Sequence, residues 1–404
     1  MSVEDEGKPE LIRYGTPAYR RALTALFAIG IATFAQLYSI QPLLHQVGQE
    51  FDVAAGQTSW LMSSTTITVA IFVLVWGVLA ERIGARTIII GGLAIATLTA
   101  IGVGIAPNWS VLVGLRFLQG IALAGPTAAT LAWVARKVEP TAVTKVSGLY
   151  IAGSTVGGMT GRLMSGFVTE LTNWRGGLLT VAAFAAIMGA LAHFLLPRAK
   201  GRKIVRQTVF EPDTSWRRSQ RFGSYVFAFV GMGMFVGVFN VLGYRIALPP
   251  WSLGPGIGSM LFLSYIAGTV ASSKAGDLTR RFGSRRVMLL GWVTMAIGLA
   301  LTIPNNLITL WIGLFVLCAG FFGNHTIASS RATRLHPRSG SGSGMYLMGY
   351  YGGSSLGGIA LGYAWDAGQW TGTLLAAAAS LVVVLVVILF IQDQPKDTAD
   401  AVRQ

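Results

Sequence analysis

Apolar residues occur along this chain in stretches of about twenty positions, and short polar or turn-forming segments separate the stretches. A stretch of that length crosses ~30 Å of hydrocarbon when it forms an α-helix. Breaks fall at turn-forming pairs such as Pro107-Asn108 and Pro249-Pro250. The pattern predicts twelve membrane-spanning helices, at 22–44, 57–80, 87–106, 110–134, 145–168, 175–196, 223–246, 256–274, 286–304, 307–331, 342–364 and 371–391.

Two sequence motifs recur half a chain length apart. Residues 77–86 read GVLAERIGAR, and residues 276–285 read GDLTRRFGSR, 199 positions later. A second, glycine-rich pair starts at Gly148 and Gly344, 196 positions apart. Two matches at nearly one separation indicate a duplicated unit of ~200 residues, and duplicated halves are typical of secondary transporters. We therefore expect an all-α integral membrane protein made of two pseudo-symmetric six-helix bundles.

The expected organisation places one bundle on each side of a polar connection. It consists of an N-terminal tail at 1–21, a first half at 22–197, a basic linker at 198–222, a second half at 223–391 and a C-terminal tail at 392–404. Both tails and the linker are expected to be cytoplasmic.

Composition and charge support the membrane assignment. Hydrophobic residues make up 53% and charged residues 12% of the chain, whereas soluble domains carry ~25% charge. With both termini inside, all but four of the 31 Lys and Arg residues fall in inner segments or tails. This bias predicts cytoplasmic termini in a bacterial cytoplasmic membrane. We attribute the net charge of +15 to this topology and to lipid headgroups, not to nucleic acid.

Four segments resemble motifs of the major facilitator superfamily. Residues 77–86 resemble its loop 2–3 signature, and residues 276–285 resemble the weaker copy in loop 8–9. Residues 116–125 resemble the fourth-helix motif of proton-coupled members, and residues 148–166 resemble the fifth-helix antiporter motif. The details are most similar to the YnfM-like, acriflavine-sensitivity branch of drug:proton antiporters. The resemblance implies proton-coupled efflux of a small organic compound by alternating access, with a proton gradient and no cofactor.

The resemblance assigns a gating role to the loop between the second and third helices. Glu81 stands for the family aspartate, which in relatives lies near the start of helix eleven and pairs with arginines. Arg82, Arg86 and Arg136 are the possible partners here, while Gly77 and Gly84 are expected to allow close approach and a tight turn. The second copy supplies Gly276, Arg281, Gly283 and Arg285, but Arg280 replaces the acid, so we expect no equivalent switch there. The simpler alternative is a topological turn with basic anchors.

Glycines repeat every four residues in the fifth and eleventh predicted helices. They are Gly153, Gly157, Gly161, Gly349, Gly353 and Gly357. Small residues at this spacing let helices pack with their backbones close together. The glycines are expected to serve tight packing, sliding of one half against the other, or both.

Two arginines lie well inside predicted spans, away from the span ends. A charge at mid-membrane costs at least ~2.5–3.5 kcal/mol, so such a residue normally faces a wet cavity. Arg116 and Arg162 are expected at one depth, as are Tyr38 and Asn240. One interpretation is a cationic rim that binds anionic groups or tunes a proton site. The other is that each arginine bonds backbone carbonyls and locks helices together.

None of the sixteen acidic residues lies in the central part of a predicted span. Proton coupling therefore lacks an obvious carboxylate, and His325, beside Asn324, is the best remaining titratable candidate. The expected residues of the substrate cavity and of coupling are Arg116, Gln119, Arg162, Tyr38, Gln41, Asn240, Asn324, His325, Tyr150 and Tyr346.

Other functions remain open at this point. Within transport, the absent carboxylate and the two arginines favour an exporter or importer of an anionic metabolite or amphiphile. A non-transporting receptor or scaffold is an alternative of another class. An enzyme is not expected, because the sequence shows no metal-spaced cluster, no Gly-x-Ser-x-Gly elbow and no phosphate-binding loop. The expected partners are a small-molecule substrate and the lipid bilayer, with the chain a monomer.

Overall fold

The computed structural model describes residues 11–198, 213–336 and 341–393. Within these ranges the regular backbone is helical, apart from one isolated bridge between Ile12 and Val138. The sequence prediction of an all-α fold is confirmed.

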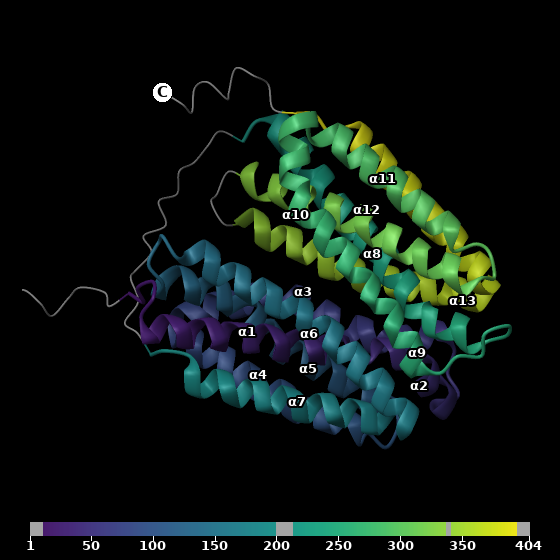
Figure 1. Ribbon diagram of the computed structural model, residues 1–404, viewed down its shortest axis with the longest axis horizontal. Helices are drawn as coiled ribbons and strands as arrows, with labels where there is room; N and C mark the ends of the chain where they lie inside the picture. The colour runs from purple at the N-terminus through teal and green to yellow at the C-terminus, as the bar shows by residue number, and fades with distance from the viewer. Residues whose placement is uncertain (1–10, 199–212, 337–340, 394–404) are drawn as a thin grey trace, which may run out of the picture. The chain divides into compact units, whose positions relative to one another are not determined.

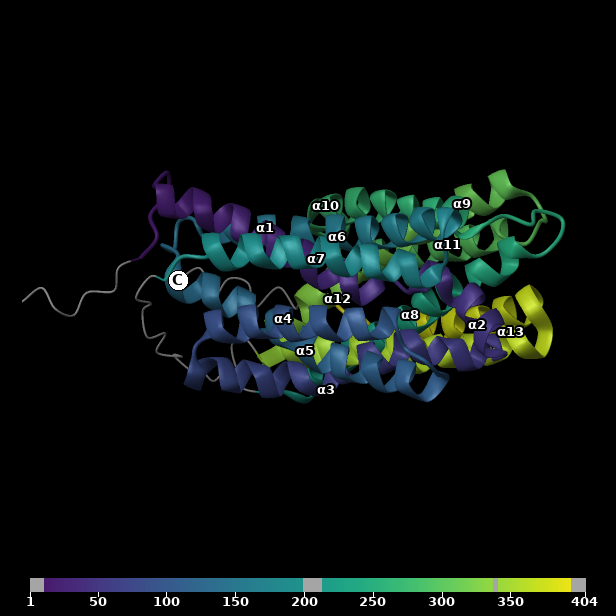
Figure 2. The same ribbon diagram turned by 90° about the horizontal axis from the view of Figure 1, so that it is seen from below.

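The helices of the first half cover the six spans predicted there. They are α1 (Pro17–Tyr38), the 3-10 turn η1 (Gln41–Leu43), α2 (Leu44–Phe51), α3 (Ala55–Ile83), α4 (Ala85–Gly104), α5 (Trp109–Lys137), α6 (Val143–Leu171) and α7 (Trp174–Leu195). In both views α1 lies along α6 and α4 lies along α5 (Figures 1 and 2).

The second half repeats this arrangement with one merged helix. Its elements are α8 (Ser215–Ala247), α9 (Pro255–Met260), the 3-10 turn η2 (Leu261–Ser264), α10 (Tyr265–Phe282), α11 (Ser284–Leu301), α12 (Leu307–Arg334) and α13 (Ser341–Leu389). Non-helical dihedral angles at Gly368 and Gln369 divide α13 between the two spans predicted there.

Ten helical segments of the described chain are long and apolar enough to cross a membrane. Two features explain why this number is lower than the twelve predicted spans. The helix α13 contains two predicted spans, and α6 carries Arg162 and many small polar residues, so it is not among the ten apolar segments.

Local chemistry explains where several helices begin. The side chains of Asn108, Asn173 and Asn306 accept hydrogen bonds from backbone N–H groups of the turns that follow them, as N-caps do. Gly84 and Gly283 adopt φ angles of +96° and +81° between consecutive helices. These positive angles favour glycine, so both copies of the repeated motif contain the expected tight turn.

The expected start of the seventh span at residue 223 is too late. The helix α8 begins at Ser215, because Thr214 caps it by accepting from the Arg217 N–H at 3.2 Å. The Arg221 guanidinium, two turns along, donates to the Asp213 carboxylate at 2.8 and 3.2 Å and lowers the pKa of that carboxyl. The predicted linker therefore ends before this helix, and its residues 199–212 lie outside the described ranges.

The chain divides into two compact units that exchange two short segments. The first unit contains the helices of the first half together with Gly254–Met260. The second contains the helices of the second half together with Ala54–Gln57. The segment Ala54–Gln57 contains the beginning of α3, and the segment Gly254–Met260 contains the whole of α9, with which the apolar stretch Pro255–Phe282 begins.

Close helix packing inside each unit depends on the repeated glycines. In the first unit, a methyl group at Gly153, Gly157 or Gly161 of α6 would lie 2.5 Å from backbone atoms of α1, at Phe27, Ile31 and Ala35. In the second unit, α13 meets α8 in the same way, with Gly353 against Phe229 and Gly357 against Gly233. Gly349 is less tight, at 3.3 Å from the Tyr225 carbonyl oxygen. Neither helix pair has room for side chains at its closest points.

The substitution Gly353→Ala tests this packing. Its methyl group would lie closer than 3.0 Å to the Phe229 carbonyl oxygen, so α13 and α8 must move apart. Overpacking of this kind costs ~1–3 kcal/mol. We expect a lower apparent melting temperature of the detergent-solubilised protein. Gly352→Ala is the matched control, because its methyl group would meet only the Phe229 ring at 3.8 Å. Equal melting temperatures for both variants would contradict the account.

Candidate functional site

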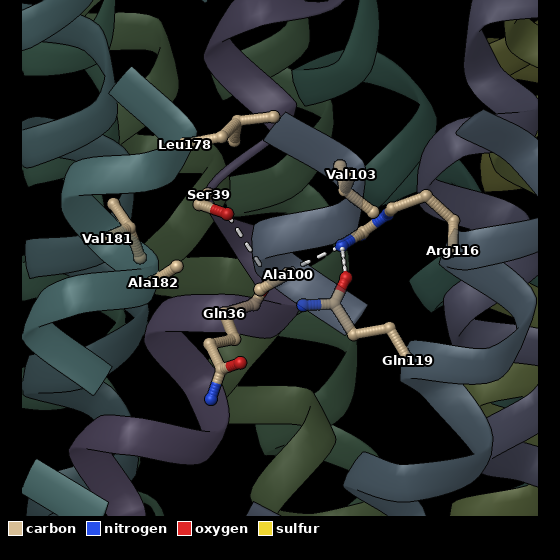
Figure 3. A pocket seen from close by; sticks show the side chains of 9 residues that line it. All are labelled: Gln36, Ser39, Ala100, Val103, Arg116, Gln119, Leu178, Val181 and Ala182. Carbon is tan, nitrogen blue, oxygen red and sulfur yellow. Dashed lines mark hydrogen bonds between the residues drawn. The ribbon is translucent and has the colours of Figure 1, made fainter. Parts of the chain in front are cut away.

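Arg116 is the most deeply buried charge of the first unit. Its side chain is 1% exposed and donates from Nε to the Leu61 carbonyl at 2.8 Å and from Nη2 to the Leu37 carbonyl at 3.1 Å. Nη1 donates to the Gln119 Oε1 atom at 2.5 Å and to the Gln36 carbonyl at 3.4 Å (Figure 3). The arginine and Gln119 are three residues apart on α5, so they share one helix face. All four acceptors are oxygen atoms without formal charge.

A small cavity of about 10 Å³ lies beside Arg116 and Gln119 (Figure 3). That volume suffices for one water molecule but not for an organic substrate. The Gln36 Oε1 atom has no hydrogen-bond partner among the described residues, and its residue lines the cavity. A single bound water is therefore the occupant that fits this cavity.

Arg162 approaches the same end of α1 from α6. Its Nε donates to Gln41 Oε1 at 2.8 Å, and its Nη1 donates to the Gly158 carbonyl at 2.8 Å. The guanidinium lies 4.1 Å from the centroid of the Tyr38 ring, which is cation–π geometry. Five of the predicted cavity residues therefore come together around residues 36–41: Arg116, Gln119, Arg162, Tyr38 and Gln41.

This geometry favours the interpretation in which the arginines lock helices. Arg116 bridges α5 to α1 and α3 through three backbone carbonyls, and Arg162 bridges α6 to η1. Ser165 of α6 adds a hydrogen bond of 2.6 Å to the Ser39 carbonyl. Sequence reasoning could not identify these acceptors, because backbone carbonyls carry no residue-specific signal.

Three other predicted cavity residues are also buried. Asn324 of α12 donates from Nδ2 to the Met288 carbonyl of α11 at 3.0 Å, so it ties two neighbouring helices. Tyr150 is 5% exposed within the hydrophobic core of the first unit. Asn240 is completely buried on α8 in the second unit.

His325 and Tyr346 form a polar contact between α12 and α13 in the second unit. The Tyr346 hydroxyl lies 2.9 Å from His325 Nδ1 and 3.3 Å from the His325 carbonyl oxygen. The imidazole stacks against Phe321, with 6.0 Å between ring centroids, and meets the Tyr350 ring at 4.9 Å. The helix α12 supplies the histidine, and α13 supplies both tyrosines.

An aromatic cluster continues from this pair. Phe235 and Phe321 stack with their centroids 4.2 Å apart, and Phe322 meets Phe235 edge-on at 5.3 Å. Tyr265 lies 5.4 Å from Phe235 and 5.5 Å from Phe322. The phenylalanines were not among the predicted cavity residues, because phenylalanine in an apolar helix gives the same sequence signal whether it packs or binds.

Of the three possible partners of Glu81, which lies just before the turn between α3 and α4, Arg136 is within ion-pair distance. Glu81 lies 3.4 Å from Arg136 of α5, and the two side chains are 52% and 33% exposed. Arg86 instead donates to the His193 and Leu196 carbonyls of the first unit, at 2.7 and 3.3 Å. Arg82 is exposed at the end of α3. Among the described residues, a methyl group at Gly77 would have no neighbour within 4 Å, so the expected close approach there is wrong.

The second copy of the loop makes different contacts. Arg280 pairs with Asp277 on the same helix, and Arg281 and Arg285 are exposed. Gly276 has open space around it, as Gly77 has. The Asp393 carboxylate accepts a hydrogen bond of 2.7 Å from the Ser284 N–H at the start of α11. No carboxylate of this loop therefore occupies the place that Glu81 has in the first copy.

Carboxylates in the described residues lie near helix ends and not inside the helices' central parts. They are Glu50, Asp52, Glu81, Glu139, Glu170, Asp213, Asp277, Asp366 and Asp393. The described part of the chain also has no group of three or more His, Cys, Asp or Glu residues placed to hold a metal ion. His325 is thus a titratable side chain well inside a helix of the second unit.

Comparison with known proteins agrees on one family. The model of the family described as Major Facilitator Superfamily matches residues 26–269 and 232–404. The inner membrane transport protein YnfM of Escherichia coli is 34% identical over 371 residues, covering 90% of this chain and 88% of YnfM. The uncharacterized MFS-type transporter YybF of Bacillus subtilis is 32% identical, covering 90% of this chain and 91% of YybF.

Solved structures show the same fold. A point mutant of the nucleoside transporter NupG matches with a TM-score of 0.74 at 17% identity, covering 92% of this chain and 100% of NupG. A bacterial homolog of the human lysosomal transporter Spinster, in an inward-facing and occupied conformation, matches with a TM-score of 0.73 at 16% identity. The match covers 93% of this chain and 97% of the chain of the Spinster homolog. At such identities the likeness concerns the fold alone.

The substitution Arg116→Ala tests the locking role of the arginine. It removes the charge-assisted hydrogen bonds to the buried carbonyls of Leu61 and Leu37, each worth ~1.5–3 kcal/mol. We expect a marked fall in the apparent melting temperature. Arg20→Ala, at an exposed position of α1, should change unfolding by less than ~0.5 kcal/mol. Arg116→Lys keeps the charge but loses the planar fork, so it should also destabilise. Parent-like stability of Arg116→Lys would show that charge, not hydrogen bonding, is what this position requires.

Proposed function

Because the chain belongs to the major facilitator superfamily, we propose that it exports a small organic compound in exchange for protons. Like its relatives, the chain is a multi-pass membrane transporter of the superfamily, and it is not an enzyme. The proposed location is the bacterial cytoplasmic membrane, with both termini on the cytoplasmic side. The distribution of Lys and Arg supports that orientation. A proton gradient is the proposed energy source, and no cofactor is needed.

The hydrogen bond between His325 and Tyr346 carries the proposal of proton coupling. A neutral imidazole accepts at Nδ1 from the Tyr346 hydroxyl. When Nδ1 takes up a proton, it becomes a donor, and the hydroxyl must accept from it instead. The Tyr346 hydroxyl then has the His325 carbonyl, 3.3 Å away, as an acceptor for its own proton. The bond between Nδ1 and the Tyr346 hydroxyl can therefore be kept in both protonation states of the imidazole.

The surroundings of this pair support a substrate with apolar, planar groups. Phe321, Phe322 and Tyr350 offer ring faces and edges around the imidazole. Aromatic rings stack on one another, and their faces attract cations. A protonated His325 and a cationic substrate would repel each other, so the two should occupy this site in turn. Such competition is the physical requirement of antiport.

The pair of Glu81 and Arg136 is the proposed switch on the cytoplasmic side. It joins the end of α3 to the end of α5 within the first unit. A half-exposed pair of this kind contributes at most ~1 kcal/mol, so it can form and break during a transport cycle. The short loop after α3, closed by Gly84, places the carboxylate at the end of its helix.

A second substrate class is favoured by a different observation. Arg116 and Arg162 place two positive charges at one end of α1, with exposures of only 1% and 2%. The four oxygens to which Arg116 donates are amide and backbone oxygens without formal charge, so they leave the positive charge of this guanidinium in place. A buried positive charge of this kind attracts anions. Transport of an anionic metabolite or amphiphile is therefore the second candidate function.

The substitution His325→Asn tests proton coupling. Asparagine keeps a polar side chain of similar size but does not titrate near neutral pH. In proteoliposomes with an imposed pH gradient, we expect gradient-driven transport to fall by more than ~90%. Substrate exchange without a gradient should continue, because the movement itself does not need the proton.

The control is His193→Asn, at an exposed position near the end of α7, which should transport as the parent does. Retention of gradient-driven transport by His325→Asn would refute coupling through this residue. Loss of exchange as well as driven transport would show instead that His325 contacts the substrate or the moving surface.

The charge swap Glu81→Arg combined with Arg136→Glu tests the switch. Each single substitution removes the attraction and places like charges ~3–4 Å apart, so transport should slow several-fold. The double variant restores an ion pair of opposite polarity and should recover much of the rate. Transport rates of all three variants, measured at equal amounts of folded protein, decide the matter. Single variants with parental rates would leave the pair without a role.

A further inference from the structure

A carboxylate of the second half holds the beginning of α3. Asp366 of α13 accepts hydrogen bonds from the backbone N–H groups of Ala55 at 3.0 Å and Gly56 at 2.8 Å. These N–H groups belong to the first turn of α3, where no carbonyl of the same helix can accept from them. The positive end of the helix dipole adds attraction for the negative charge. Asp366, Ala55 and Gly56 all belong to the second compact unit.

A carboxylate of the first half holds the beginning of α9. Glu170 of α6 accepts a hydrogen bond of 2.9 Å from the Gly256 N–H. The stretch from Pro255 to Phe282, which α9 begins, is one of the membrane-crossing segments. Glu170 and Gly256 both belong to the first compact unit. In each case, therefore, an acid of one half of the sequence binds the start of a spanning segment of the other half.

The two contacts are equivalents under the internal duplication. Glu170 and Asp366 are 196 positions apart, which is the separation of the glycine-rich repeat. Their partners Gly56 and Gly256 are 200 positions apart, close to the separation of the repeated loop motif. The neighbours also correspond: a methyl group at Gly56 would meet the ring of Tyr363, and one at Gly256 would meet the ring of Phe167 at 3.3 Å. One contact thus occurs twice.

The position of the acids on their own helices is otherwise unfavourable. Glu170 is the residue before the last of α6, and Asp366 lies two residues before the non-helical Gly368 of α13. A negative charge near a helix C-terminus is repelled by the dipole of its own helix. Binding to the N-terminus of another helix offsets that repulsion. The carboxylates therefore favour the arrangement seen here over one in which these helix ends separate.

We propose that Glu170 and Asp366 form a pair of latches that hold one conformation of the transport cycle. The proposal rests on alternating access, as proposed above, in which the two halves of the sequence move against each other. The helix α3 has the Asp366 contact at its first turn and Glu81 at its opposite end. Opening at the latched ends requires both carboxylates to leave their N–H partners. The ion pair of Glu81 and Arg136, at the other end of α3, can then form when the latches are open and break when they are closed.

Thiol labelling of the purified protein in lipid nanodiscs tests the latches. Both faces are accessible there, so the result does not depend on orientation, substrate or a proton gradient. The natural Cys318 is replaced by alanine, and single reporters Ser59→Cys and Ser259→Cys are introduced one turn beyond the latched N–H groups. Both serines are buried, with exposures of 1% and 0%. A bulky maleimide should label them slowly in the parent.

We expect Asp366→Asn to speed labelling of both reporters by about tenfold, the population change that a loss of ~1.4 kcal/mol produces. Glu170→Gln should do the same, and the two effects should multiply in the double variant, because both latches act on one conformational equilibrium. Asp366→Glu keeps the charge and should stay within about threefold of the parent. Asp213→Asn, the same chemical change at a carboxylate outside the spanning segments, should have no effect.

Two results would overturn the proposal. Unchanged labelling in a monodisperse Asp366→Asn protein would show that the carboxylate does not hold α3. Faster labelling confined to the reporter next to the substituted acid would show local fraying of one helix end and no shared movement. Either result would leave the proton-exchange assay of His325→Asn untouched. Failure of that assay with coupled labelling intact would instead leave the latches in place and change only the proposed cargo or coupling.

Discussion

A polar group inside hydrocarbon must find its partner within the protein, and the rest of this structure depends on that requirement. The end of α1 shows the consequence most clearly. There Arg116 and Arg162 take their acceptors from the helix end itself and from amide side chains, and no carboxylate is involved for Arg116. These acceptors are backbone carbonyls of α1 and α3 and the side-chain amide of Gln41 in η1. The arginines therefore fix the mutual positions of these helices as well as satisfying their own donors. At this helix end, the hydrogen bonds that satisfy the buried charges are the same bonds that hold the helices together.

The same requirement governs where movement is possible. Within each unit, glycines bring α6 against α1 and α13 against α8 so closely that a methyl group does not fit. Contacts this close leave the two helices of each pair little room to shift against each other. The carboxylates, in contrast, lie near helix ends, where water and free N–H groups lower the cost of breaking a contact. Glu81, Glu170 and Asp366 each join different helices through bonds that can be exchanged. Closely packed helix pairs inside each unit, with contacts at the helix ends that can break and form again, fit the proposed transport by two rocking halves.

Much of the architecture could be predicted from the sequence, because apolar length and duplication are strong signals in a membrane chain. The all-α membrane fold and the tight turn at Gly84 followed from those signals. The start of α8 was missed, because its first turns are basic and polar and extend beyond the apolar stretch. Partners were harder than positions: the sequence singled out Arg116 and His325, but the backbone carbonyls around the first and the phenylalanines around the second carry no distinctive pattern. Asp366 and Glu170 do show a distinctive sequence pattern, because both copies of the repeat place an acid near a helix C-terminus. An acid at that position is repelled by the dipole of its own helix.

The proposed activity is the exchange of protons for an organic compound. The most direct measurement uses inverted membrane vesicles with and without the protein, energised to an acidic interior, with the gradient followed by a pH-sensitive fluorophore. Cationic aromatic dyes and organic anions are added in turn. We expect proton release that depends on the protein and on the dye, and that is absent from vesicles containing His325→Asn. Release on organic anions alone would contradict it and identify the chain as a transporter of anions.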